Sequence, residues 1–221
     1  MGNVEPRAAI WDMDGVIADT AAFHLAAWQD VFCRRGVDYT AAAFRRHFGQ
    51  RNDTIIRAAL GEAVDELTID EIAVEKETAF RSAAVGKVKP FPGVLALLGA
   101  MREHAFRTAV GSSAPAENIR LITDTLGITA SFDTVVAGRE VTEGKPSPQG
   151  FLLAAERLGA APARCVVIED APAGVAAAKK AGMRCVAVTN SHPAAALAEA
   201  DRVVATLETV GINDLERLIN G

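Results

Sequence analysis

The feature that most constrains the fold is a regular alternation of short apolar runs and helix-like segments that begins at Val94. The apolar runs are almost continuously hydrophobic, which is typical of parallel strands buried on both faces. Glycine follows three of the helix-like segments, at Gly127, Gly159 and Gly182, and gives the usual stop signal of a helix. The pattern predicts an α/β protein whose parallel sheet is covered by helices on both sides.

We expect strands at residues 107–111, 134–137, 165–168, 185–188 and 202–205. The expected helices cover residues 94–104, 115–126, 148–158, 173–181, 194–199 and 212–219. One earlier apolar run, residues 8–11, has the same strand character.

The segment from Asp19 to Val88 differs from the rest of the chain, because it lacks Val/Ile runs and contains alanine-rich amphipathic stretches. Helices are expected at residues 20–35, 41–48, 53–60 and 68–84. The Lys-Pro-Phe-Pro-Gly sequence of residues 89–93 indicates a linker. We therefore expect a discontinuous α/β core of residues 1–18 and 89–221, with a helical domain of residues 19–88 inserted after the first strand.

Composition excludes several classes of function. The chain has 221 residues, of which 50% are hydrophobic, and its net charge of −5 at pH 7 leaves no basic patch for nucleic acid. No apolar run approaches the roughly 20 residues of a membrane helix, and the first seven residues lack the apolar region of a signal peptide. Cys33, Cys165 and Cys185 form no Cys-x-x-Cys motif, and the last two are expected to be buried thiols. We expect a cytoplasmic monomer without nucleic-acid or membrane partners.

Two carboxylates, Asp12 and Asp14, follow the first strand and precede Gly15. Residues at i and i+2 point to the same side of an extended chain. Two carboxylates so close repel each other unless a cation or a shared proton intervenes. Taken alone, the pair is compatible with a metal site, with a catalytic dyad, or with an acidic strand end that caps a turn.

Polar residues also follow three later strands: Ser112 and Ser113, Lys145, and Glu169 and Asp170. Each has a plain structural explanation, because a serine can cap a helix, a loop lysine can be solvated, and acids can interact with a helix dipole. In an open parallel sheet, however, ligands bind beyond the carboxyl ends of the strands. The gathering of all these groups at one sheet edge favours a functional site.

These residue types fit phosphoryl transfer. Carboxylates suit a hard cation such as Mg²⁺, whereas hydroxyl, ammonium and backbone N–H groups suit phosphate oxygens. Asp12 would attack phosphorus and form an aspartyl-phosphate. Asp14 would protonate the leaving oxygen and then activate the water that hydrolyses the intermediate. The candidate catalytic residues are Asp12, Asp14, Ser112 and Lys145, and the candidate metal ligands are Asp12, Asp14, Glu169 and Asp170.

Four segments resemble, in order, the motifs of the haloacid dehalogenase superfamily of phosphotransferases. They are Asp12-Met13-Asp14-Gly15-Val16 with Asp19-Thr20, Val110-Gly111-Ser112-Ser113, Lys145-Pro146, and Ile168-Glu169-Asp170-Ala171 with Gly174. The resemblance implies a Rossmann-like core, Mg²⁺, a helical cap over the active site, and a metal contact from the backbone carbonyl of Asp14. Dehalogenating members lack the second aspartate, so Asp14 favours phosphoryl transfer.

Within this superfamily, residues 19–28 resemble the first cap helix of the β-phosphoglucomutase-like subgroup. His24 and Trp28 are four residues apart and share a helix face, where a histidine can help control the acid/base aspartate or simply pack in the cap. Gly49-Gln50-Arg51-Asn52 resembles the substrate-specificity loop, and Lys76 falls where the subgroup often has a lysine. The candidate substrate-binding residues are His24, Trp28, Arg51, Asn52, Lys76 and Ser113.

Two related activities remain open. A mutase needs a second phosphate site, partly from a Lys-Asn pair after the second motif, whereas residues 113–118 read Ser-Ala-Pro-Ala-Glu-Asn without a lysine. This resembles the hydrolases of sugar phosphates and other small phosphomonoesters, so we expect a small phosphorylated metabolite as substrate and water as acceptor, with the β-phosphoglucomutase reaction as the alternative. A phospho-accepting signalling module would need an aspartate after residues 107–111, which the sequence lacks.

Overall fold

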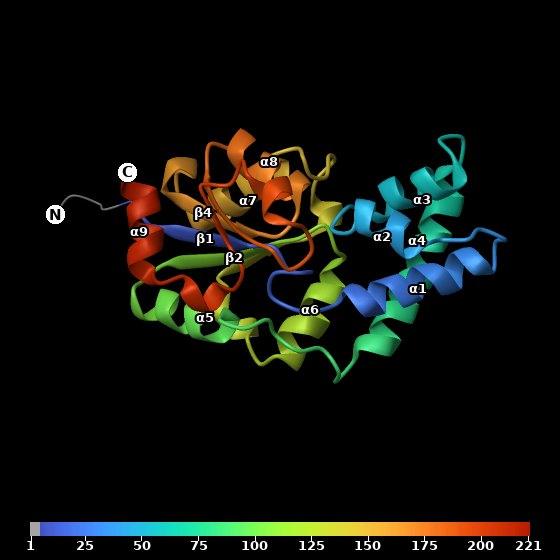
Figure 1. The fold of residues 1–221 in the computed structure, drawn as a ribbon, viewed down its shortest axis with the longest axis horizontal. Helices are drawn as coiled ribbons and strands as arrows, with labels where there is room; N and C mark the ends of the chain where they lie inside the picture. Colours follow the sequence, from blue (N-terminus) through green and yellow to red (C-terminus); the bar gives the residue numbers. More distant parts are fainter. Residues whose placement is uncertain (1–4) are drawn as a thin grey trace.

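The computed structural model describes residues 5–221, in which six parallel strands form one sheet in the order β3-β2-β1-β4-β5-β6 (Figure 1). The strands are β1 (Ala8–Trp11), β2 (Arg107–Gly111), β3 (Thr134–Val136), β4 (Cys165–Glu169), β5 (Arg184–Val188) and β6 (Arg202–Val204). Although β1 comes first in the chain, it lies between β2 and β4, with Ile10 in register with Ala109 and Val167. The predicted α/β class and the place of the first strand in the sheet are confirmed.

The helices of the described residues are α1 (Ala21–Cys33), α2 (Ala41–His47), α3 (Asn52–Leu60), α4 (Glu66–Ala84), α5 (Val94–Glu103), α6 (Ala116–Thr125), α7 (Gln149–Leu158), α8 (Pro172–Lys180) and α9 (Ile212–Asn220). The α-helix expected at residues 194–199 is wrong, because only a 3₁₀ turn, Ala194–Leu197, forms there. Leu197 is the buried residue of this turn. A longer helix would gain little from packing, and a single helical turn does not propagate on its own.

Alternate residues of β1 face the two helical layers that cover the sheet. Ile10 packs in one layer with Phe151 of α7, whereas Trp11 packs in the other with Leu98 of α5. Figure 1 shows α7 and α8 on one side of the sheet and α5 on the other, and Leu215 of α9 packs in the same layer as α5. Neither Ile10 nor Trp11 has any exposed surface, which is why the strands are hydrophobic throughout instead of alternating with polar residues.

Helices α1–α4, called here the inserted helices, lie together beyond one end of the sheet (Figure 1). They have their own buried core, which includes Trp28, Phe32, Phe44, Ile56 and Ile72. The chain enters and leaves them through two adjacent segments, because the Asp19 N–H donates to the Lys89 carbonyl at 3.2 Å and the Phe91 N–H to the Ile17 carbonyl at 3.0 Å. The expected boundaries of the helical domain, between residues 18 and 19 and between residues 88 and 89, fall in these paired segments. The division of the chain into two domains remains a proposal. Residues 1–4 of the expected core lie outside the described residues.

No helix within residues 5–221 is long and apolar enough to cross a membrane. Cys165 and Cys185 are buried free thiols, as expected, and Cys33 is an exposed free thiol. The expectation that the first seven residues lack a signal peptide concerns mainly residues 1–4, which the structure does not describe.

Candidate active site

Asp12 lies at the carboxyl end of the central strand and is held there by its backbone, whose N–H donates to the Ile168 carbonyl at 3.0 Å. The Lys145 Nζ lies 2.5 Å from Asp12 Oδ1 and 2.6 Å from Glu169 Oε1. Burial opposes the charge on Lys145, but the two carboxylates outweigh it and raise the pKa of the ammonium above its ordinary value. Lys145 is therefore a fixed positive charge beside Asp12, and it is not the solvated loop lysine of the plain explanation.

Three carboxylates, those of Asp12, Glu169 and Asp170, gather at this point. One oxygen of each lies within 4.8 Å of the others, and all three residues are buried. Burial, with a contribution from Glu169 that Lys145 opposes, raises the pKa of Asp12 to about 7. Burial and the other two carboxylates also raise the pKa of Asp170 well above its ordinary value. Such crowding is unfavourable for bare anions and is relieved by a cation.

The donor set fits a hard metal ion. All the donors are carboxylate oxygens, the ligand type of Mg²⁺, Ca²⁺ and Mn²⁺. Asp170 Oδ2 is buried and has no hydrogen-bond partner within the described residues, whereas a buried carboxylate oxygen normally has one. An ion between Asp12 and Asp170 would satisfy this oxygen.

Glu169 has a second role in the structure, because both of its oxygens have protein partners. Oε1 accepts from Lys145, and Oε2 accepts from the backbone N–H groups of Asp170 at 2.8 Å and Ala171 at 2.9 Å. These contacts fix the carboxylate and, through it, the ammonium of Lys145. Glu169 therefore positions Lys145. Its carboxylate has fewer free acceptor positions for a metal than the carboxylates of Asp12 and Asp170.

Gly174 of α8 is required by this arrangement, because a Cβ at this position would overlap the carboxylate of Glu169. We expect Gly174→Ala to lower the free energy of unfolding by about 1–3 kcal/mol, as overpacking of a buried site does, and to displace Lys145. The matched control is Gly99→Ala in α5, where a Cβ would meet nothing within 4 Å. The control should stabilise by up to about 1 kcal/mol, since alanine favours a helix. Urea unfolding measures the change in the free energy of unfolding for both variants. Equal changes in the two variants would contradict the requirement for glycine at position 174.

Asp14 has a different environment from Asp12. Its Oδ1 accepts from Thr20 Oγ1 at 2.5 Å and lies 3.1 Å from His24 Nε2. Burial opposes ionisation of Asp14, but His24, Thr20 and Lys76 together outweigh it and lower the pKa of the carboxyl. The side chain of Asp14 is therefore ionised and directed to the inserted helices. It lies outside the three-carboxylate cluster, so a metal contact from Asp14 would come from its backbone carbonyl, as the resemblance implies.

His24 lies between Asp14 and Lys76. Lys76 Nζ lies 2.8 Å from His24 Nδ1, and His24 Nε2 lies 3.1 Å from Asp14 Oδ1 on the other side of the ring. The ring also stacks on Phe80, with 3.9 Å between the ring centroids. Two residues of the inserted helices, His24 and Lys76, thus fix the orientation of Asp14.

Most of the predicted site residues line one pocket between the sheet end and the inserted helices. They are Asp12, Asp14, His24, Trp28, Asn52, Lys76, Ser112 and Ser113. Lys145 lines the adjoining pocket and contacts Asp12 directly. Trp28 is only 1% exposed and stacks on Phe32, so it belongs mainly to the core of the inserted helices. Ser112 Oγ accepts from the Ala114 N–H at 3.1 Å, which leaves its hydroxyl proton free to donate into the pocket.

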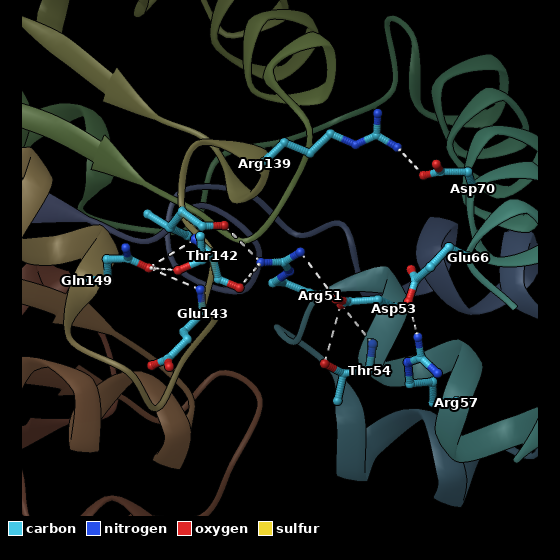
Figure 2. A network of polar contacts seen from close by, with 11 residues as sticks. Arg51, Asp53, Thr54, Arg57, Glu66, Asp70, Arg139, Thr142, Glu143 and Gln149 are labelled. Carbon is cyan, nitrogen blue, oxygen red and sulfur yellow. Dashed lines mark hydrogen bonds and ion pairs between the residues drawn. The ribbon is translucent and has the colours of Figure 1, made fainter. Parts of the chain in front are cut away.

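Arg51 lines the adjoining pocket with Lys145, and Figure 2 shows its guanidinium beside Thr142. Its Nη1 donates to the backbone carbonyls of Val141 at 3.0 Å and Thr142 at 3.1 Å, in the loop that precedes Lys145. A Cβ at Gly144 would come within 2.6 Å of Arg51 Cδ, so the glycine allows the arginine to lie across this loop. In this arrangement Arg51 joins the start of α3 to the core, and its expected contact with substrate stays a prediction.

A model of the haloacid dehalogenase-like hydrolase family matches residues 6–182 of the chain. The chain belongs to this family. It is 36% identical over 181 residues to the fructose-1-phosphate phosphatase YqaB of Escherichia coli, an alignment that covers 81% of this chain and 94% of the relative. It is 32% identical over 208 residues to the validoxylamine A 7'-phosphate phosphatase of Streptomyces hygroscopicus subsp. limoneus, covering 92% and 95%.

Among solved structures of this hydrolase family, the β-phosphoglucomutase of Clostridium difficile superimposes on the chain with a TM-score of 0.88. The two are 26% identical, and the match covers 97% of each chain. The resemblance to the β-phosphoglucomutase-like and sugar-phosphatase subgroup is confirmed by these relatives.

Glu77 and Asn118 are polar residues of the site to which no role was assigned from the sequence. Glu77 is 5% exposed, Asn118 is fully buried, and the two side chains are hydrogen-bonded. A signal for Glu77 was present in the sequence, because the buried face of α4 follows the helical spacing of Ile69, Ile72, Ala73, Lys76, Glu77, Phe80 and Ala84. Charged residues on an otherwise apolar helix face indicate a buried polar network.

Proposed function

We propose that the chain is a metal-dependent phosphatase that hydrolyses small phosphomonoesters, sugar phosphates in particular, through an aspartyl-phosphate on Asp12. The observation that carries this proposal is the separation of two neighbouring aspartates into different environments. Asp12 lies beside a fixed ammonium and a buried acidic cluster, whereas Asp14 faces a threonine and a histidine. One aspartate suits nucleophilic attack, and the other suits proton transfer.

In the first step, an oxygen of Asp12 forms a bond to phosphorus while the bond from phosphorus to the leaving oxygen breaks. Protonated Asp14 gives its proton to the leaving oxygen, and Ser112 and Lys145 donate to the phosphate oxygens. In the second step, water attacks phosphorus, Asp14 takes a proton from it, and the Asp12 carboxylate is released. The ionised Asp14 of this structure has the form needed for the second step.

Asp12 and Asp170 are the residues that would hold Mg²⁺, together with the Asp14 backbone carbonyl. The ion would supply positive charge against the phosphate oxygens in the transition state. Residues 19–88 would form a cap domain over this site, since His24 of α1 contacts Asp14 and Lys76 of α4 contacts His24. Water is proposed as the acceptor, because the buried Asn118 after the second motif is engaged by Glu77 and Arg81 instead of being free for a second phosphate.

The test of the proposed function is phosphate release from a panel of sugar phosphates and other phosphomonoesters, with and without Mg²⁺. Products are identified by chromatography, so that transfer of the phosphate within an aldose 1-phosphate is separated from hydrolysis. We expect free phosphate to be the main product. An aldose 6-phosphate formed faster than free phosphate would replace the phosphatase proposal by the mutase alternative.

Mg²⁺ is expected to raise the melting temperature of the protein. At a concentration 100 times its dissociation constant, the gain is about 2.7 kcal/mol, or about 5–10 °C for a chain of this size. At one fixed Mg²⁺ concentration, the gain should be larger at pH 8 than at pH 6, because the raised pKa values of Asp12 and Asp170 mean that Mg²⁺ must displace protons at the lower pH. Asp170→Asn should remove most of the gain, and Asp38→Asn, at an exposed position, should retain it. A gain that Asp170→Asn leaves unchanged would place the metal elsewhere.

A further inference from the structure

Glu77 is a buried carboxylate that the proposed reaction does not use. It lies on the inward face of α4, is 5% exposed, and lines the same pocket as Asp12 and Asp14. Its Oε1 accepts from Lys76 Nζ at 2.8 Å and from Asn52 Nδ2 at 2.8 Å, and its Oε2 accepts from Asn118 Nδ2 at 2.6 Å. Glu77 thus joins α4 to the start of α3 and to α6 of the core.

The contacts of Glu77 make it a fixed negative charge. Burial opposes its ionisation, but Lys76, His24 and Asn118 outweigh this effect and lower the pKa of the carboxyl. Three hydrogen bonds occupy three of about four acceptor positions that a carboxylate offers. One acceptor position therefore remains for a hydroxyl or ammonium donor in the pocket.

The same network neutralises the positive charge of Lys76 in the pocket. Lys76 is the only lysine or arginine among the described residues that line this pocket. Its Nζ donates to Glu77 Oε1 and lies 2.8 Å from His24 Nδ1. Arg51 is engaged by the backbone carbonyls of residues 141 and 142, and Arg81 donates to Asn118 Oδ1 at 3.0 Å.

The position of the leaving group follows from the proposed reaction. Phosphorus must lie next to Asp12 and the leaving oxygen next to Asp14. From Asp14, a chain of hydrogen bonds runs through His24 and Lys76 to Glu77, with distances of 3.1, 2.8 and 2.8 Å. Asp14 and Glu77 line the same pocket, so a leaving group that occupies this pocket beside Asp14 lies near Glu77.

We propose that Glu77 determines substrate specificity by admitting phosphomonoesters whose leaving group is uncharged or cationic and rejecting those that carry a second phosphate or a carboxylate. This inference rests on the proposed function, because it needs the leaving group to lie on the Asp14 side. Glu77 acts in two ways: it repels an added anion directly, and it occupies the ammonium of Lys76 that would otherwise bind one. Like charges brought together at a desolvated site are a strong means of discrimination.

The predicted rejection of anionic leaving groups is tested on the wild-type protein with a series of substrates that are phosphorylated at the same position. Glucosamine 6-phosphate, glucose 6-phosphate, 6-phosphogluconate and glucose 1,6-bisphosphate carry increasingly negative groups, and fructose 1-phosphate with fructose 1,6-bisphosphate forms a second pair. We expect kcat/KM to fall by about tenfold or more for each negative charge added to the leaving group. A second phosphate that leaves kcat/KM unchanged would overturn the proposal, whether or not any variant folds.

Glu77→Gln assigns the effect to this residue, because glutamine keeps the size of the side chain and removes its charge. We expect the ratio of kcat/KM for the singly over the doubly phosphorylated sugar to fall by about tenfold, mainly through a gain for the bisphosphate. The matched control is Glu75→Gln, which removes an exposed carboxylate from the opposite face of α4. An equal loss for both substrates in Glu77→Gln would show a merely structural role and overturn the proposal.

Failure of the proposed function is distinguishable from failure of this inference. Absence of phosphate release from the whole panel would remove the proposed function. Thermal-shift titration of Asp12→Asn, which cannot be phosphorylated, still compares the binding of the mono- and bisphosphate without turnover. Weaker binding of the bisphosphate, reversed in Asp12→Asn/Glu77→Gln, supports the inference, and equal binding in both proteins overturns it.

Discussion

Asp12→Asn is expected to lower phosphate release by at least about 10⁴-fold, because removal of a catalytic nucleophile costs at least this much in well-studied hydrolases. The amide can neither attack phosphorus nor carry the charge that Lys145 neutralises at 2.5 Å. The measurement is kcat/KM on the best substrate of the panel at saturating Mg²⁺. Mass spectrometry of acid-quenched protein should detect a phosphorylated form in the wild type and none in the variant.

The control for Asp12→Asn is Asp38→Asn, which makes the same chemical change at an exposed position outside the site. It should keep wild-type kinetics, and a melting curve establishes that both variants are folded. Phosphate release by Asp12→Asn within about tenfold of the wild type would assign the nucleophile to another residue.

Asp14→Asn is expected to lower kcat by about 10²- to 10⁴-fold, the usual contribution of a general acid/base. The reason is that asparagine cannot take a proton from the attacking water, although it can still accept hydrogen bonds from Thr20 and His24. The phosphorylated form should therefore accumulate with an activated substrate such as p-nitrophenyl phosphate, whose leaving group needs little protonation. Rapid-quench experiments followed by mass spectrometry measure this accumulation.

A different outcome would identify another role for Asp14. If Asp14→Asn hydrolyses the activated and the ordinary substrate equally slowly and no phosphorylated form appears, Asp14 acts before phosphoryl transfer, by positioning the substrate. The two aspartates are thus separated by experiment: one variant forms no intermediate, and the other forms it and fails to release it.

Much of the fold could be predicted from the sequence because its signals are local. The strands at residues 8–11 and 107–111 form within the predicted bounds, since continuous apolar runs between chain-breaking residues favour buried strands. The start of α4 was predicted two residues late, because Asp65 accepts from the Thr68 N–H and caps the helix before its apolar pattern begins. The turn at Ala194–Leu197 was predicted as a longer helix, because alanine content alone does not reveal how little of this segment is buried.

The sequence by itself determined which chemical groups lie at the sheet end, because Asp12, Ser112, Lys145 and Asp170 follow the ends of predicted parallel strands, and these ends share one edge of the sheet. Only the tertiary structure decided what each group touches. The packing of α4 against α1 and α6 brings Lys76 to His24 and Glu77 to Asn118, and the loop around Gly144 takes the guanidinium of Arg51. These partners are 41 to 90 residues apart along the chain. Hydrophobic periodicity fixes which side of a helix is buried, but the partner of a buried charge depends on how the helices pack, and no local pattern encodes that.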